Sequence, residues 1–340
     1  MGSAAAAIGL GGLGQLELEV LSGLDDVELV AGADVSAAAR EVFEREHDAP
    51  AYPDHEAMFD AHGDDLDLAL IVTPHTLHYE QARACLEAGL HVYIEKPMVT
   101  DVADAVALLE RADERELVVQ VGYQRHFHPG FREVKRVIED GRIGDLRAAN
   151  AFIGQDWIGL HEDTWRVDPS LSGGGQLYDT GSHLLEALCW LTGAEPRSVS
   201  AEIEYASPGV DVDSALSLSL ERDGRRIQAG VTVCGDGVEL EPSEGYAIWG
   251  SGGRLVFDGE TVRLAERGAT VYESVVEGGT DFASLTSAKL GNFLDSIDGE
   301  AEPAVPGTVG LRVTALTEAA YLADEEGRRV NVRGLIDEAS

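Results

Sequence analysis

The sequence is almost without lysine: only Lys96, Lys135 and Lys289 occur among 340 residues, and arginine supplies the other 22 of the 25 basic side chains. Aspartate and glutamate number 62, which gives a formal net charge of −37. This charge argues against nucleic acid or an anionic membrane as a partner, because binding phosphate groups needs a basic surface. Acidic residues spread along the whole chain are typical of a surface adapted to high salt, so we expect a halophilic source.

Cysteine and long apolar runs are also scarce. Cys85, Cys189 and Cys234 are far apart and form no C-x-x-C pair, which predicts a reducing environment and no disulfide framework. No apolar run reaches the roughly 18 residues of a membrane-spanning helix. The start of the chain lacks the charged region of a secretory signal. We therefore expect a cytoplasmic protein.

The length and a hydrophobic content of 44% predict a globular chain of two domains. Residues 1–122 alternate short apolar runs with amphipathic stretches. Continuous apolar strands between helices predict an α/β, Rossmann-type, doubly wound parallel sheet with helices on both faces. The strands expected are Ala4–Leu10, Val27–Ala33, Leu66–Val72, Leu90–Ile94 and Leu117–Val121; the helices are Leu13–Leu24, Ala37–Glu46, Leu77–Ala88 (ended by Gly89) and Val102–Glu114.

Residues 123–340 are predicted to form an α+β domain that binds substrate. Leu216–Leu220 and Ile227–Val233 alternate apolar with small or polar residues, which predicts a large, mainly antiparallel sheet open on one side. We expect the open face to be apolar and to join copies into a homodimer or homotetramer. Whether the helix at about 308–325 packs back on the first domain stays open. Further strands are expected at Tyr246–Gly250, Arg254–Asp258, Thr261–Leu264 and Thr270–Val276, and helices at Pro129–Glu139, Leu184–Leu191, Ser284–Ile297 and Thr308–Ala323.

Gly9, Gly11 and Gly14 form a G-x-G-x-x-G motif between a predicted strand and a predicted helix. The first glycine permits a tight turn, the second lets the backbone approach a pyrophosphate, and the third lets helix and strand pack closely. The helix N-terminus would offer N–H groups to the phosphates. Asp34 ends the second strand, where an acid accepts hydrogen bonds from the adenosine ribose. A loop that merely contains glycines would not account for all four features.

This motif predicts a dinucleotide cofactor, with NAD ahead of NADP. The carboxylate of Asp34 would repel a 2′-phosphate. No arginine follows it directly, since the next residues are Val35 and Ser36. If Asp34 turned away, Ser36 and Arg40 could hold the phosphate, so NADP remains an alternative.

A second glycine-rich segment, Gly173–His183, carries an acid and an imidazole. Asp179 and His183 are four residues apart and would share one helical face if the helix begins near Asp179. A lone buried histidine is usually structural, but a nearby acid under a glycine loop favours general acid–base chemistry. Lys96, directly after an apolar strand, is the third candidate, because a partly buried lysine can exchange a proton near neutral pH and arginine cannot.

In this order and spacing, the segments of the chain resemble the Gfo/Idh/MocA oxidoreductases, named after glucose–fructose oxidoreductase, inositol dehydrogenase and a rhizopine-catabolism protein. The resemblance covers nearly the whole chain. The chain departs from the family pattern at Glu186, where Asp is frequent, and at Gln124, where Asn or another small residue is common. The matching segments are Gly9–Gly14, Thr73–His78, Glu95–Pro97, Tyr123–Pro129, Trp165–Arg166 and Gly173–His183.

The resemblance implies an NAD(P)-dependent oxidoreductase that transfers hydride between a sugar, inositol or sugar-derivative hydroxyl and nicotinamide. His183 would take the hydroxyl proton, Lys96 would stabilise the alkoxide and relay protons, and Asp179 would bind a neighbouring hydroxyl. Lys96 would lie on a turn that Pro97 makes rigid through a cis peptide bond. The cofactor contacts implied are Gly9, Gly11, Gly12, Leu13, Gly14, Asp34, Val35, Thr73, Pro74, His75, His78, Glu95, Lys96 and Gln124. The substrate contacts implied are Lys96, Arg125, Trp165, Arg166, Asp179 and His183.

Two other functions remain open within the same fold. A redox-neutral glycosidase or lyase would oxidise its substrate transiently and form no net NADH. A non-catalytic regulator would sense the dinucleotide, although such relatives tend to lose the trio of Lys96, Asp179 and His183. We expect no metal site, because no acid or cysteine follows the histidine pairs of His75–His78 and His126–His128 at ligand spacing.

Overall fold

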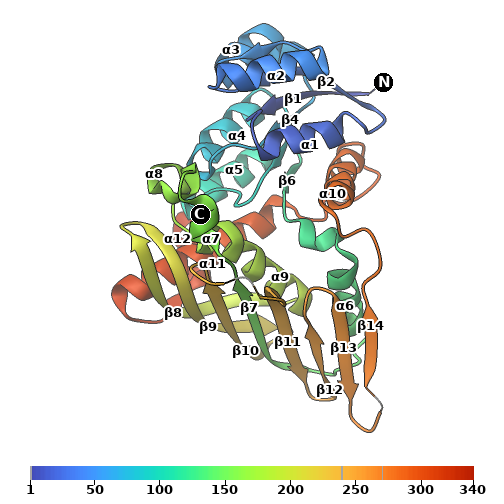
Figure 1. The fold of residues 1–340 in the computed structure, drawn as a ribbon, viewed down its shortest axis with the longest axis vertical. Helices are drawn as coiled ribbons and strands as arrows, with labels where there is room; N and C mark the ends of the chain where they lie inside the picture. The colour runs from blue at the N-terminus through green and yellow to red at the C-terminus, as the bar shows by residue number, and fades with distance from the viewer. Residues whose placement is uncertain (1, 239, 270) are drawn as a thin grey trace. The chain divides into compact units, whose positions relative to one another are not determined.

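The computed structural model describes residues 2–238, 240–269 and 271–340, and these divide into two compact units (Figure 1). The first unit contains residues 2–99, 104–124 and 281–310, and the second contains the rest of the described residues. The sequence predicted a boundary near residue 122. The segment 281–310 lies between two parts of the second unit in sequence, yet it folds with the first unit.

Six parallel strands form the sheet of the first unit, in the order β3-β2-β1-β4-β5-β6. The predicted doubly wound fold is confirmed, and this strand order is that of dinucleotide-binding Rossmann domains. The middle strands are buried on both faces, which explains their continuous apolar sequence. The strands are β1 (Ser3–Ile8), β2 (Val27–Ala33), β3 (Ala51–Tyr52), β4 (Leu68–Ile71), β5 (His91–Ile94) and β6 (Val119–Val121).

Side-chain caps and glycine set the ends of several helices in this unit. The side chains of Ser36, Asp54 and Asp281 each accept a backbone N–H in the first turn of a helix. Gly89 follows its helix at φ +85°, as predicted. The elements are α1 (Leu13–Leu21), α2 (Ala37–His47), α3 (His55–His62), η1 (Gly63–Asp65), η2 (His75–Leu77), α4 (His78–Glu87), α5 (Val102–Glu114, shared with the second unit) and α10 (Phe282–Ile297).

The helix α10 folds with the first unit, whereas the helix at 308–325 belongs to the second unit from Leu311 onward. Leu290 and Phe293 of α10 are buried in the same core as Leu18 of α1 and Tyr93 of β5. The helix α11 (Gly307–Glu326) buries Leu316 and a row of alanines in the core of the second unit. Packing against distant partners decides which unit each helix joins.

The second unit is built on a nine-stranded sheet in the order β14-β13-β12-β11-β7-β10-β9-β8-β15 (Figure 1). Among the described strands of this sheet, only the pair β10 and β7 is parallel, so the predicted mainly antiparallel sheet is confirmed. The predicted strand at 270–276 is present as β14; Thr270 lies outside the described residues. The strands are β7 (Leu146–Gly154), β8 (Glu195–Ser207), β9 (Val210–Arg222), β10 (Arg225–Cys234), β11 (Glu244–Gly250), β12 (Gly253–Phe257), β13 (Thr261–Glu266), β14 (Tyr272–Val275) and β15 (Val330–Asn331).

One face of this sheet is covered and the other is exposed. Along β10, Ile227 and Val231 are buried whereas Gln228 and Thr232 are exposed. The exposed face carries mainly small and polar side chains, with Phe152 at 43% exposure, so it is less apolar than predicted. The remaining elements are η3 (Gln124–Phe127), α6 (Pro129–Glu139), α7 (Trp157–His161), η4 (Trp165–Val167), α8 (Pro169–Ser172), η5 (Leu177–Gly181), α9 (Ser182–Thr192) and α12 (Val332–Ala339).

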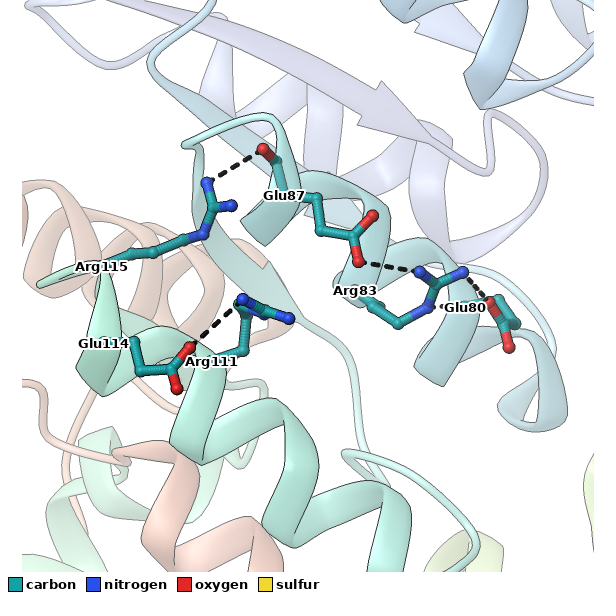
Figure 2. Close-up of polar contacts among 6 residues, drawn as sticks. All are labelled: Glu80, Arg83, Glu87, Arg111, Glu114 and Arg115. Carbon is teal, nitrogen blue, oxygen red and sulfur yellow. Dashed lines mark hydrogen bonds and ion pairs between the residues drawn. The ribbon is translucent and has the colours of Figure 1, made fainter.

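Arginines on the helix surfaces pair with neighbouring acids. Figure 2 shows Arg83 of α4 between two acids, with its nitrogens 2.6 Å from Glu80 and 2.8 Å from Glu87. On α5, Arg111 lies 3.2 Å from Glu114. Each such exposed pair stabilises a helix by only about 0.2–0.5 kcal/mol. Within the described residues, no helix is both long and apolar enough to span a bilayer.

Candidate active site

The first glycine loop joins β1 to α1 and leaves open space at its tip. Gly9 has φ +96°, and a Cβ there would lie 2.3 Å from the carbonyl oxygen of Val72. A Cβ on Gly14 would lie 2.1 Å from the carbonyl oxygen of Gly9. By contrast, a Cβ on Gly11 or Gly12 would meet nothing within 4 Å. The backbone therefore needs the two outer glycines, and the space beside the N-terminus of α1 fits a pyrophosphate.

Asp34 at the end of β2 faces this loop. Its Oδ2 accepts the backbone N–H of Leu10 at 2.8 Å, and its Oδ1 accepts that of Ser36 at 2.7 Å. The guanidinium of Arg40 donates to the backbone carbonyls of Asp34 and Val35. Asp34 is thus not turned away, and Arg40 is tied to the backbone rather than directed at a phosphate. Val35 is 91% exposed beside the carboxylate.

After β4, a buried histidine connects two turns of the first unit. His78 is fully buried, with Nδ1 2.8 Å from the carbonyl oxygen of Pro97 and Nε2 2.9 Å from that of Thr73. Burial lowers the pKa of His78, and the two carbonyls only partly offset it. Thr73 also donates its hydroxyl to Gln81. His78 was expected to touch the dinucleotide, but its ring lies inside the unit; Pro74 and the buried His75 begin the turn η2.

Lys96 follows β5 on a turn whose Lys96–Pro97 peptide bond is cis. The backbone N–H of Lys96 donates to Glu95 Oε2 at 3.2 Å. Glu95 Oε1 accepts from Tyr93 at 3.0 Å and from Lys289 at 2.6 Å. The Glu95 carboxylate therefore lies within the first unit, with a backbone contact to the lysine that the sequence singled out.

Asp179 and His183 lie in the second unit at the start of α9. Asp179 belongs to the π-helical turn η5, and α9 begins at Ser182, two residues before the predicted Leu184 but after Asp179. Helices of this wide type occur often at functional sites. Both side chains are buried. Asp179 and His183 therefore do not lie on one regular α-helix as expected, because Asp179 lies in the wider turn that precedes α9.

The Asp179 carboxylate is held by Arg166, which the sequence singled out, and by Trp157, which sequence reasoning missed. Its Oδ2 accepts from Trp157 Nε1 at 2.8 Å and from Arg166 Nε at 3.1 Å. His161 Nε2 lies 4.0 Å away. The Arg166 guanidinium also stacks 4.6 Å from the centre of the Trp165 ring. The Arg166 guanidinium and the Trp157 indole N–H thus both contact this acid, with the His161 ring nearby.

Asp211 on β9 holds the glycine segment that leads to Asp179. It accepts the N–H groups of Gly175 at 2.6 Å and Leu177 at 2.7 Å, and the hydroxyl of Tyr321 at 2.5 Å. A Cβ on Gly175 would lie 2.0 Å from the Asp211 carbonyl oxygen. Burial raises the pKa of Asp211, against the opposing effect of these donors. No sequence motif marked Asp211, because its partners lie on distant segments.

The segment after Gln124, which begins the turn η3, is held by acids of the second unit. Arg125 binds both carboxylate oxygens of Glu244. Burial alone would lower the pKa of Arg125, but Glu244 outweighs it and raises that pKa. The next residue, His126, places Nε2 2.7 Å from Oε1 of Glu186, the acid at which the chain departs from the family pattern.

The other histidine of this segment has a capping role. His128 Nδ1 accepts the backbone N–H of Gly130 at the start of α6. In the part of the chain that the structure describes, no group of three or more histidine, cysteine, aspartate or glutamate side chains is arranged to hold a metal ion.

Two family models match the chain, one in each predicted domain. A model described as an oxidoreductase family with an NAD-binding Rossmann fold matches residues 4–123. A model described as the GFO/IDH/MocA C-terminal domain matches residues 131–256. The chain belongs to the Gfo/Idh/MocA family. This member is accordingly an oxidoreductase that binds NAD(P) through its Rossmann domain.

Relatives of this Gfo/Idh/MocA protein extend over the whole chain. Inositol 2-dehydrogenase of Rhizobium meliloti is 27% identical over 340 residues, which cover 96% of this chain and 98% of the relative. A scyllo-inositol 2-dehydrogenase (NADP(+)) of Bacillus subtilis is 26% identical over 78% of each chain. A solved oxidoreductase of Agrobacterium radiobacter, in complex with NAD+, L-tartaric acid and magnesium, has a TM-score of 0.85 and 18% identity, covering 98% of this chain and 100% of that one. That structure supports the fold.

Proposed function

We propose that this Gfo/Idh/MocA protein is an NAD-dependent dehydrogenase that oxidises a hydroxyl group of a sugar or polyol. The position of Asp34, fixed by two backbone N–H groups at the glycine loop, carries the proposal. A carboxylate there accepts ribose hydroxyls and repels a 2′-phosphate. The substrate class is supported by relatives that are named inositol dehydrogenases.

The residues of the first unit fit the dinucleotide. The backbone at Gly11, Gly12 and Leu13 would hold the pyrophosphate at the N-terminus of α1. Asp34 would bind the adenosine ribose, with the exposed Val35 beside the adenine. When bound, NAD supplies the acceptor for the hydride. The loop after β4 and the Lys96 turn would contact the nicotinamide half.

Three side chains carry the proton chemistry of the proposal. The His183 imidazole takes the proton from the substrate hydroxyl as general base. The Lys96 ammonium stabilises the alkoxide oxygen and relays the proton. Asp179, oriented by Trp157 and Arg166, binds a neighbouring hydroxyl of the substrate. Holding the substrate hydroxyl in the reactive geometry contributes part of the rate enhancement.

Several residues expected to contact ligands are assigned here to positioning. His78 and Glu95 lie inside the first unit and hold the Lys96 turn. Arg125 is bound by Glu244 and lies over the Phe131 ring of α6, so it is assigned to this packing instead of the substrate. Trp165 and Arg166 remain candidates for the wall of the substrate site, because Arg166 donates to Asp179 and its guanidinium stacks on the Trp165 ring.

A panel of inositols and aldoses, assayed for NADH or NADPH formation in molar KCl, tests the proposal. We expect kcat/KM with NAD to exceed that with NADP by about tenfold or more, which corresponds to about 1.4 kcal/mol. Asp34→Ser should remove this preference, and Glu19→Gln, an exposed acid on α1, should preserve it. Turnover of substrate without net reduced nucleotide would instead support the redox-neutral alternative.

A further inference from the structure

A buried cluster of two acids and one lysine lies inside the first unit. Glu17 of α1 is 0% exposed, Glu95 after β5 is 5% exposed, and Lys289 of α10 is 4% exposed. The Lys289 ammonium donates to Glu17 and, at 2.6 Å, to Glu95. One of only three lysines in the chain thus joins three segments that are far apart in sequence.

The charges of this cluster balance only if one acid keeps its proton. Two ionised carboxylates beside one ammonium would leave a net negative charge in a dry interior, which is strongly unfavourable. Among the described residues, the buried Oε2 of Glu17 has no hydrogen-bond partner, so an ionised Glu17 would leave a charged oxygen unpaired. Burial raises the pKa of Glu17 to about 8. Burial acts on Glu95 in the same direction, but the attraction and hydrogen bonding of Lys289, together with the charge of Lys96 and other neighbours, outweigh it and lower the pKa of Glu95.

The surroundings of the cluster are shaped to hold Glu95 in one place. Tyr93 donates its hydroxyl to Glu95 Oε1 at 3.0 Å, and its ring centre lies 5.5 Å from the Lys289 ammonium. On β6, the side chain of Gln120 donates to the Lys289 carbonyl at 2.8 Å. A Cβ on Gly122 would lie 2.1 Å from Glu95 Oε1, so a larger residue there would displace the carboxylate.

The cluster is connected to both candidate ligand-binding segments of the first unit. Glu17 lies on the helix that begins at the glycine loop. Glu95 Oε2 accepts the backbone N–H of Lys96 at 3.2 Å. The charged and titratable groups that interact with Glu95 include Glu17 of α1, Lys289 of α10, Tyr93 of β5, His78 of α4 and Lys96 itself.

We propose that Lys289 is a positioning residue for Lys96: it holds Glu95 ionised while Glu17 carries the cluster's proton, and Glu95 anchors the Lys96 backbone. The proposal rests on the proposed function in taking Lys96 as catalytic. When Glu17 loses its proton, a second carboxylate competes for Lys289 and the hold on the Lys96 turn weakens. The cluster thereby couples the position of the turn to a single buried proton.

The three lysines make a direct test possible. Protein labelled with [15N]lysine gives three backbone amide signals, which substitution of each lysine by arginine assigns. As the pH rises through the region of the Glu17 pKa, the Lys96 amide signal should shift with the titration of one proton. In Glu17→Gln, whose neutral amide replaces the protonated acid, the signal should stay in place. Glu19→Gln, an exposed acid on the same helix, is the matched control and should titrate like the unaltered protein.

The stability of the folded protein should depend on the protonation of Glu17. A folded-state pKa raised from 4.5 to about 8 means that the folded state holds the Glu17 proton more tightly than the unfolded state does. The contribution of Glu17 is therefore present at low pH and is lost as pH rises from 4.5 to about 8. Between these values, the unfolding equilibrium constant of the unaltered protein should rise relative to that of Glu17→Gln by up to about tenfold per pH unit.

Kinetics test the link to the reaction. Lys289→Met should lower kcat about 10- to 100-fold, as expected for a misplaced catalytic group, with KM for NAD within about twofold. Lys135→Met should retain full activity. A Lys96 amide that does not titrate, or that titrates equally in Glu17→Gln, would overturn the inference even if Lys289→Met does not fold. Absence of hydride transfer in the unaltered protein would reject the proposed function alone, since the amide measurement needs no substrate.

Discussion

The three lysines occupy three different environments, although the sequence gives them no obvious distinction. Lys96 lies on the turn after β5, and Lys289 is buried between two acids. Lys135 donates to the carbonyl oxygen of Trp190 at 2.7 Å and lies 3.3 Å from Glu139 on its own helix. Because arginine forms almost every surface ion pair in this chain, we expect each remaining lysine to have a specific role.

Substitution of the proposed catalytic groups should separate chemistry from cofactor binding. Lys96→Met and His183→Ala should each lower kcat by about 10²–10⁴-fold, the usual contribution of a general acid or base. The Kd of NAD, measured by fluorescence titration, should change by less than about twofold. Lys135→Met controls for the loss of a lysine elsewhere. Turnover equal to that of the unaltered protein in either variant would reject the assignment.

The sequence predicted the residues that lie in local motifs better than those that act through distant partners. Gly9, Gly14 and Asp34 could be singled out because a strand, a turn and a helix constrain them within one short stretch, and their local geometry is that of a glycine turn beside an acid. Trp157 and Asp211 were missed, because their roles depend on hydrogen bonds to segments that only the folded chain brings near. The role of a buried charge is likewise set by its partners and not by its neighbours in sequence.

At the scale of elements, the β1–α1 turn offers a matched pair of glycine substitutions. Gly14→Ala places a Cβ 2.1 Å from the Gly9 carbonyl oxygen and should reduce the free energy of unfolding by about 1–3 kcal/mol. Gly11→Ala meets no atom within 4 Å and should change it by less than about 0.5 kcal/mol. Chemical denaturation provides both values.

NAD affinity should distinguish the two substitutions differently from stability, because Gly11→Ala should weaken NAD binding without destabilising the fold. The Cβ of Gly11→Ala would occupy the open space assigned to the pyrophosphate, so NAD should bind more weakly while the fold is kept. Isothermal titration of each variant measures this effect. If Gly11→Ala bound NAD as tightly as the unaltered protein, the proposed phosphate position would be wrong.

The pattern of strands could be predicted because burial on both faces or on one face leaves a clear imprint on sequence. The all-apolar β4 and the alternating β10 are examples. Helix affiliation could not be predicted in the same way: α10 and α11 are both apolar, and only packing distinguishes the core that each one joins. The π-helical turn at Asp179 also escaped prediction, because nothing in the local sequence separates it from the helix that follows.

At the scale of the whole molecule, the net charge of −37 should make stability depend on salt. The surface pairs of Figure 2 offset little of the repulsion among exposed acids. At molar ionic strength the screening length falls to about 3 Å, which suppresses this repulsion. We expect the Tm in molar KCl to be clearly higher than in dilute buffer, with glycerol at equal osmolality as the control. Equal Tm values in low and molar salt would remove the basis for a halophilic adaptation.

The transfer of deuterium from substrate to nicotinamide tests the central claim most directly. The protein would be incubated in molar KCl with NAD and either perdeuterated inositols or perdeuterated aldoses, and the nucleotide would be analysed by mass spectrometry. The account predicts NADH that carries one deuterium for each substrate oxidised, with label transfer nearly abolished in His183→Ala. Reduced nucleotide without deuterium, or undiminished label transfer in His183→Ala, would contradict it.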